Sequence, residues 1–148
     1  MSKPLSTTLP GTWRLVSRTD VAANGERRID PALGEDPVAI LFYDHSGNFA
    51  AQFMKRDRTA AVDVVAAGPA KNNSRAKDGY DAYFGSYTID DAAGTVTQEL
   101  AGALSKEDVG HVLTRGMTVE GDELTIALET TSVEGEPVTR TLRWKRVG

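Results

Sequence analysis

The chain contains no cysteine, and its two histidines, His45 and His111, lie far apart in the sequence. The absence of thiols excludes disulfide bonds, a thiolate nucleophile and cysteine metal ligands. Neither histidine belongs to a cluster with the ligand spacing of a zinc or iron site. We therefore predict no metal site, and expect His45 to be solvated in its turn and His111 to lie near a strand start.

The chain also lacks long apolar runs and blocks of one charge sign. No apolar stretch approaches the length of a membrane span, and the opening "MSKPLSTTLPGTW" has no apolar core of a signal peptide. The net charge is −4 with acids and bases interleaved, and no basic stripe carries the aromatic residues typical of nucleic-acid surfaces. We expect a cytoplasmic protein that binds neither membranes nor nucleic acids.

The sequence fingerprints of several enzyme classes are missing as well. There is no Gly-x-Ser-x-Gly elbow, no phosphate-binding loop and no dinucleotide fingerprint. The 148 residues, 40% apolar and 26% charged, have the composition of one ordinary globular domain. We predict a single domain over residues 1–148 and no bound cofactor.

Short segments of alternating apolar and polar residues, separated by turn residues, fill most of the sequence. The segments "VAILFYDHSGNFAAQFMKRD" and "GSYTIDDAAGTVTQEL" each indicate a strand, a turn and a second strand. Asn24-Gly25 is a strong hairpin signal. Repeated along the chain, this pattern predicts an all-β barrel or sandwich of about eight to ten strands.

One segment, residues 60–84, interrupts the pattern with many Ala, Gly, Pro and Asn residues. Asn73 or Ser74 could cap a short helix from Ala76 to Ala82. A long connection in a small barrel often lies across one mouth, so we predict a lid over residues 57–82. Residues 1–9 are expected to form a flexible N-terminus.

Alternation along the strands assigns polar side chains to the interior. In "VLTRGMTV", Arg115 and Met117 share the inward face, and in "TVTQEL" Gln98 faces inward between apolar neighbours. Tyr43 and Tyr87 face inward on their strands by the same rule. Polar groups in a fully packed core are costly, which favours an interior that holds a ligand.

Two other strands complete the assignment of faces. In "TWRLVSRTD", one face carries Trp13, Leu15 and Ser17, and the opposite face carries Arg14, Val16 and Arg18. In "AAQFM", the direction of Gln52 is ambiguous because the apolar residues on either side compete for the interior. No acidic residue is assigned to the interior by these patterns.

The segments "GTWRLVS", "YDHSGNFAAQ", "YFGSYTIDDAAGTV" and "LRWKRV" together resemble the lipocalin-like domain family of small stand-alone bacterial and fungal barrels. The resemblance covers nearly the whole chain, and its third segment is the most specific. It implies a single antiparallel up-and-down β-barrel with one open and one closed end. It also implies that Trp13 packs at the closed end against a basic residue of the last strand, Arg146 or Arg143.

The functional hypotheses start from Arg115. A buried arginine keeps its proton and must meet an anion or several hydrogen-bond acceptors. One alternative is an ion pair with an acid at the barrel mouth, such as Glu99, Asp78 or Asp81. The other is a ligand carboxylate, enolate or carbonyl group.

The first hypothesis is a binding module for a small, largely apolar molecule that carries a carbonyl or anionic group. The predicted ligand-binding residues are Tyr43, Gln52, Tyr87, Gln98, Arg115 and Met117. The alternative is a structural role for these residues. The tyrosine hydroxyls would then form hydrogen bonds with the backbone, and Gln98 would belong to a structural network with Arg115 or a tyrosine.

The second hypothesis is a cofactor-independent isomerase or cyclase of secondary metabolism. Arg115 would stabilise negative charge developing on a carbonyl oxygen, and Tyr87 or Tyr43 would donate a hydrogen bond. Such catalysis needs no metal, thiol or titrating histidine. The sequence leaves the choice between the two hypotheses open, together with the question of a homodimer.

Overall fold

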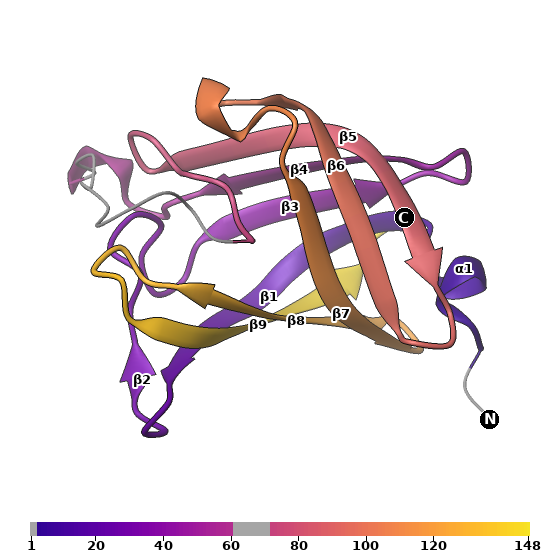
Figure 1. Ribbon diagram of the computed structural model, residues 1–148, viewed down its shortest axis with the longest axis horizontal. Coiled ribbons are helices and arrows are strands. Elements are labelled where there is room, and N and C mark those ends of the chain that lie inside the picture. The colour runs from indigo at the N-terminus through magenta and orange to yellow at the C-terminus, as the bar shows by residue number, and fades with distance from the viewer. Residues whose placement is uncertain (1–2, 61–71) are drawn as a thin grey trace.

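A computed structural model describes residues 3–60 and 72–148 of the chain. In these residues, eight strands close into an antiparallel barrel because β1 pairs with both β3 and β9, while the short β2 extends one end of β1 (Figure 1). The strands are β1 (Gly11–Ala22), β2 (Arg27–Arg28), β3 (Val38–Tyr43), β4 (Asn48–Met54), β5 (Tyr80–Asp90), β6 (Thr95–Ala103), β7 (Val112–Glu120), β8 (Glu123–Thr131) and β9 (Pro137–Arg146). The predicted all-β barrel is confirmed.

The turns predicted from short polar motifs join consecutive strands. Asn24 and Gly25 lie between β1 and β2, with Gly25 at a φ of +86° that favours glycine. Between β3 and β4, a carboxylate oxygen of Asp44 accepts hydrogen bonds from the backbone N–H groups of Ser46 and Asn48. These local bonds fix the turn and with it the register of the hairpin. A one-residue slip of that register would turn every side chain to the other face.

A β-bulge in β1 changes which side chains face the interior. The register with β9 shifts between Leu15 and Ser17. As a result, Trp13 before the bulge and Arg18 and Asp20 after it are all buried. The prediction that Arg18 lies on the face opposite Trp13 was wrong, because the extra residue of a bulge reverses the alternation beyond it.

The closed end of the barrel is built around Trp13. Its ring is fully buried, the guanidinium of Arg146 lies 4.3 Å from the ring centroid, and its Nε1 donates to the backbone oxygen of Leu9 at 2.9 Å. The expected contact of Trp13 with Arg146 is confirmed. A stacked pair of this kind contributes on the order of 1 kcal/mol.

A helical turn precedes the barrel and packs against the closed end. Helix α1 (Leu5–Thr8) lies beside β5 and β7 (Figure 1). Leu5 and Leu9 belong to the buried core. We had expected residues 1–9 to form a flexible N-terminus, yet two leucines of this segment are buried. The apolar residues of "LSTTL" are four apart, so they lie on the same side of the turn.

The connection between β4 and β5 differs from the prediction. Residues Arg58–Ala60 form a short 3₁₀ turn, η1. The helix predicted from Ala76 to Ala82 is absent, since Lys77 pairs with Tyr80 across a turn and β5 begins at Tyr80. Asp78 and Gly79 have positive φ values of 52° and 67°, which end any helix there. The rest of the predicted lid includes residues 61–71, which lie outside the described residues.

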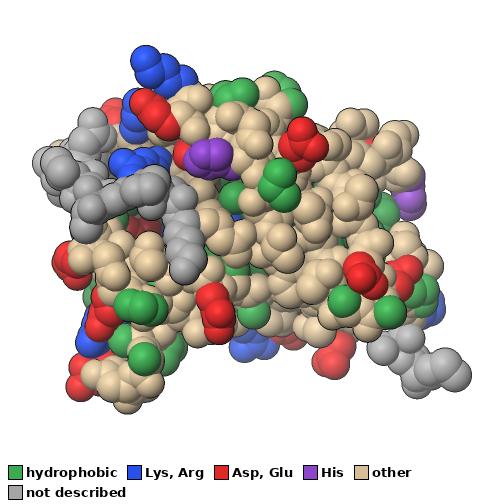
Figure 2. All heavy atoms as spheres, viewed as in Figure 1, with side chains coloured by type: hydrophobic (Ala, Val, Ile, Leu, Met, Phe, Trp, Pro, Cys, Tyr) green, Lys and Arg blue, Asp and Glu red, His purple; other side chains and the backbone are tan. Residues whose placement is uncertain are grey.

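The outer surface mixes charged and apolar side chains. Figure 2 shows green, red and blue groups scattered over the visible face. No helix in the described part of the chain is long and apolar enough to cross a membrane.

Replacing Leu9 with alanine should destabilise the fold by about 2–5 kcal/mol, because Leu9 is fully buried and the shorter side chain leaves an empty space in the closed end. The free energy of unfolding in urea measures the effect. The matched control is Leu104→Ala, at a leucine that is 45% exposed, for which we expect a change within about 0.5 kcal/mol. Equal effects of the two substitutions would contradict the burial of Leu9, directly after α1, in the core.

Candidate functional site

A cavity of about 290 Å³ lies in the barrel, and its lining includes the loop between β8 and β9, at the end of the barrel opposite α1 (Figure 1). Its volume is at the low end of the range for small-molecule sites. Part of the lining is apolar and aromatic, and it includes Leu41, Phe53, Ile126, Leu142 and Trp144. An eight-stranded barrel has room for one small ligand when its interior side chains leave such a space.

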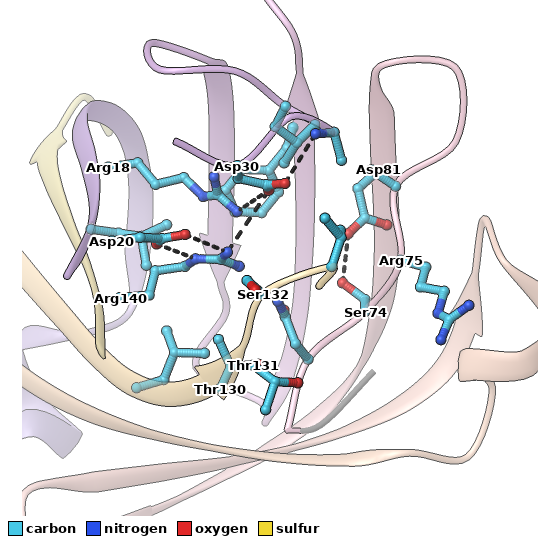
Figure 3. Close-up of a pocket in the computed structure, with 18 of the residues that line it drawn as sticks. Arg18, Asp20, Asp30, Ser74, Arg75, Asp81, Thr130, Thr131, Ser132 and Arg140 are labelled. Atoms are coloured by element: carbon cyan, nitrogen blue, oxygen red, sulfur yellow. Dashed lines mark hydrogen bonds and ion pairs between the residues drawn. The ribbon is translucent and has the colours of Figure 1, made fainter. Parts of the chain in front are cut away.

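Four charged side chains form one wall of the cavity (Figure 3). Arg140 on β9 holds Asp20 on β1 through two hydrogen bonds of 2.7 and 2.9 Å. Arg18 on β1 donates to Asp30 at 2.9 Å, and Arg140 lies 3.8 Å from Asp30. Asp30 is held in its loop because its second oxygen accepts from the backbone N–H of Ala32. The expectation of no inward acid was therefore wrong.

The four charges of this wall compensate one another. Burial alone would raise the pKa of Asp30, but Arg18 and Arg140 outweigh burial and keep that pKa below its ordinary value. Burial lowers the pKa of Arg18, although an arginine stays protonated at physiological pH. Two guanidinium groups thus face two carboxylates, and this wall has no charge left for a ligand to neutralise.

Arg115 on β7 faces the cavity from another side and has only neutral oxygens as partners. The side chain is 5% exposed. Its Nη1 donates to the backbone oxygen of Asn72 at 2.7 Å and to that of Thr114 at 3.2 Å, and Nη2 lies 3.5 Å from Asn73 Oδ1. Burial lowers its pKa, while Tyr83 and Tyr43 act in the opposite direction.

No ion pair among the described residues involves Arg115. Of the three acids considered as partners, Asp78 pairs with Arg58, Asp81 accepts from Ser74, and Glu99 is exposed on β6. Within this part of the chain, Arg115 therefore forms none of the ion pairs considered as one alternative. The positive charge of Arg115 thus faces the cavity, and no carboxylate among the described residues pairs with it.

Gln98 and Tyr43 line the cavity as a hydrogen-bonded pair. Gln98 Nε2 donates to the hydroxyl of Tyr43, and both side chains are buried. Burial raises the pKa of Tyr43. The alternative in which Gln98 forms a network with a tyrosine is confirmed, and the pair nevertheless lies at the cavity surface.

The other predicted site residues lie outside the cavity lining. Tyr87 is buried edge-on against Tyr43, 4.9 Å between ring centroids, and its hydroxyl donates to the backbone oxygen of Asp44. Met117 belongs to the packed core, and Gln52 is exposed on the outer side of β4. His111 is partly exposed and lies 3.6 Å from Asp108, away from the cavity.

Asp81, considered from the sequence as a mouth acid and as part of a short helix, lies on β5 and lines the cavity. One oxygen, Oδ2, accepts a hydrogen bond of 2.5 Å from Ser74, and the other, Oδ1, is buried without a partner among the described residues. Mainly burial, with help from nearby Asp108, raises the pKa of Asp81 to about 6. The indole Nε1 of Trp144 is likewise buried without a described partner.

The segment that carries Ser74 is fixed by the connection between β6 and β7. The hydroxyl of Ser105 donates to the backbone oxygen of Arg75 at 2.9 Å, and the Arg75 N–H donates to Asp108 Oδ2 at 2.8 Å. Ser105 and Asp108 are both buried. Because of these bonds, Ser74 can hold the Asp81 carboxyl in one orientation.

The model of the lipocalin-like domain family matches residues 10–147. The chain belongs to this family. No curated protein matches the chain. The lipocalin-like barrel, with its open mouth and partly polar interior, is suited to small-molecule binding in general.

The sequence does not predict Arg18, Asp20 and Arg140 of the lipocalin-like cavity, and only for Arg140 does it contain a pattern that would have done so. Arg140 could have been found, since the alternation of Val138, Leu142 and Trp144 places it on the inward face of "VTRTLRW". The inward turn of Arg18 and Asp20 had no such signal, because the bulge that causes it leaves no clear pattern. In the part of the barrel that the structure describes, no group of His, Asp and Glu side chains could hold a metal ion.

The raised pKa of Asp81 predicts how stability depends on pH. Its pKa of about 6 in the folded state lies above the ordinary value of 3.8, so the folded state binds this proton more tightly. The resulting stabilisation is present at low pH and is lost as the pH rises through about 6. Between about pH 4 and 7, the free energy of unfolding of wild type should fall by up to about 3 kcal/mol relative to that of Asp81→Asn.

Urea unfolding of both proteins across this pH range measures the difference. The comparison removes the contribution of acids elsewhere in the barrel, which both proteins share. Parallel stability profiles for wild type and Asp81→Asn would contradict the assignment of the raised pKa to Asp81.

Proposed function

We propose that the barrel binds a small, largely apolar molecule whose carboxylate or carbonyl group contacts Arg115. The observation that carries this proposal is the buried guanidinium of Arg115, which meets only neutral oxygens among the described residues. A buried charge without a counter-charge is unfavourable. An anionic ligand group would supply the counter-charge that none of the described residues supplies.

The contrast with two other arginines of the cavity lining, Arg18 and Arg140, supports Arg115 as the anchor. Arg18 and Arg140 are held by Asp30 and Asp20 at hydrogen-bond distance. An anion beside either of these would compete with an existing carboxylate. The guanidinium of Arg115 has five N–H donors. It can donate hydrogen bonds to a ligand without breaking an ion pair.

The remaining lining fits the rest of such a molecule. Leu41, Phe53 and Leu142 offer apolar surface to a hydrocarbon body. The paired Gln98 and Tyr43 leave polar atoms at the cavity wall that can orient the ligand head group. In this proposal Met117 and Tyr87 support the site from the packed core, and Gln52 takes no part.

Decanoate and 1-decanol test the proposal, because they share a chain and differ in the charge of the head group. Wild type should bind decanoate in calorimetry, and Arg115→Gln should weaken that binding roughly 10- to 100-fold, since a hydrogen-bonded charged group contributes about 1.5–3 kcal/mol. Binding of 1-decanol should change little between the two proteins. Fluorescence of the cavity residue Trp144 provides a second readout.

The matched control is Arg143→Gln, at an exposed arginine that pairs with Glu123 on the outer surface. Its affinity for decanoate should equal that of wild type. An unchanged affinity of Arg115→Gln, or no binding of decanoate to wild type, would refute the proposed anchor.

A second candidate function is a cofactor-independent isomerase or cyclase. It is supported by the hydroxyls of Tyr43 and Tyr83, which lie close enough to Arg115 to influence its pKa. Together these groups could stabilise negative charge developing on a carbonyl oxygen of a folded substrate. Since Tyr87 donates to the backbone, Tyr43 or Tyr83 takes the donor role first considered for Tyr87.

A linear trienone that can cyclise within itself tests this activity. Wild type should speed ring formation above the rate in buffer, and Arg115→Gln should lose the acceleration. Product formation is followed by chromatography. Equal rates with wild type, with Arg115→Gln and in buffer would exclude cyclisation of this substrate class.

A further inference from the structure

The carboxyl group of Asp81 is a polar feature of the cavity that the proposed function does not use. Asp81 is 5% exposed and lines the cavity from β5. Ser74 occupies one of its oxygens, and the other oxygen, Oδ1, has no hydrogen-bond partner among the described residues. A buried acceptor that is left unsatisfied destabilises the empty protein.

The charged groups on the facing wall are already committed to one another. Figure 3 shows Asp81 and Ser74 on one side of the cavity, and Arg18, Asp20, Asp30 and Arg140 on the other. Arg18 donates to Asp30 and Arg140 donates to Asp20, so both guanidiniums have carboxylate partners. A hydrogen-bond donor from a ligand would therefore satisfy Asp81 without disturbing an ion pair.

We propose that Asp81 is a second polar anchor, which accepts a hydrogen bond from a hydroxyl group of the bound molecule. The ligand class is then a hydroxylated carboxylic acid or hydroxylated carbonyl compound, with one polar group at Arg115 and another at Asp81. This inference rests on the proposed function, because it assumes that Arg115 binds the first group.

A hydroxyl fits this position better than an ammonium group. Burial raises the pKa of Asp81 to about 6, so its carboxyl changes protonation state close to neutral pH. A hydroxyl both donates and accepts hydrogen bonds, and it can pair with either form of the carboxyl. An ammonium group only donates, needs the ionised carboxylate, and must itself lose its hydration in the cavity.

Decanoate and a positional series of hydroxydecanoates are the probes. At neutral pH, at least one hydroxydecanoate should bind wild type roughly 10-fold or more tightly than decanoate, the gain expected from a hydrogen bond to a charged group. Asp81→Leu should lose this preference and still bind decanoate. Calorimetry gives the affinities, and circular dichroism checks that the variant is folded.

Two further variants make the result decisive. Asp122→Leu alters a carboxyl that is 77% exposed and does not line the cavity, so this control should keep the full preference. Asp81→Asn keeps the shape of the side chain and removes its charge, and it replaces Asp81→Leu if that variant does not fold. It should reduce the preference, because a neutral acceptor forms a weaker hydrogen bond.

The outcomes separate this inference from the function on which it rests. If decanoate binds through Arg115 but no hydroxydecanoate is preferred, or the preference survives in both Asp81 variants, Asp81 is no anchor and the proposed function stands. If neither decanoate nor any hydroxydecanoate binds wild type, the proposed function fails together with the inference.

Discussion

The bulge in β1 between Leu15 and Ser17 is the constraint on which the cavity depends. Before the bulge, Trp13 faces the closed end of the barrel, where Arg146 stacks on its ring. After the bulge, Arg18 and Asp20 face the open end of the interior. One irregular residue thus lets a single strand supply an aromatic side chain to the closed end and charges to the cavity wall.

The interior that results divides its charges into two kinds. Asp20 and Asp30 neutralise Arg140 and Arg18. Removing one partner of such a buried ion pair typically lowers the free energy of unfolding by about 3–5 kcal/mol. These ion pairs therefore shape the wall and resist displacement by a ligand. The interactions of Arg115, of the free oxygen of Asp81 and of the indole N–H of Trp144 stay incomplete among the described residues. Incomplete interactions are what a ligand can satisfy.

The sequence predicts the strands well because their signals are local. Alternation with period two places Arg115 and Gln98 inside the barrel, and turn residues such as Asn24-Gly25 separate the strands. Alternation gives the face of a side chain but not its level along the barrel axis. For this reason Tyr87, whose hydroxyl bonds to the Asp44 backbone, was expected in the site although it packs below the cavity.

Other errors came from features that depend on three-dimensional contacts. Asp20 turns inward because of a bulge, and the sequence around the bulge resembles a regular strand. Asp81 falls in the short helix predicted after a cap at Asn73 or Ser74, whereas the turn at Asp78 and Gly79 starts β5 instead. Tertiary pairing of β5 with β4 and β6 overrides this local preference.

The central claim is that Arg115, and not the charged wall, receives the ligand head group. A crystal structure of the protein with a bromine-labelled decanoate tests it most directly, because anomalous scattering locates the chain and fixes its direction. The account predicts the ligand inside the barrel, with its carboxylate about 2.7–2.9 Å from the guanidinium nitrogens of Arg115. A carboxylate bound to Arg18 or Arg140, or a ligand outside the barrel, would contradict it.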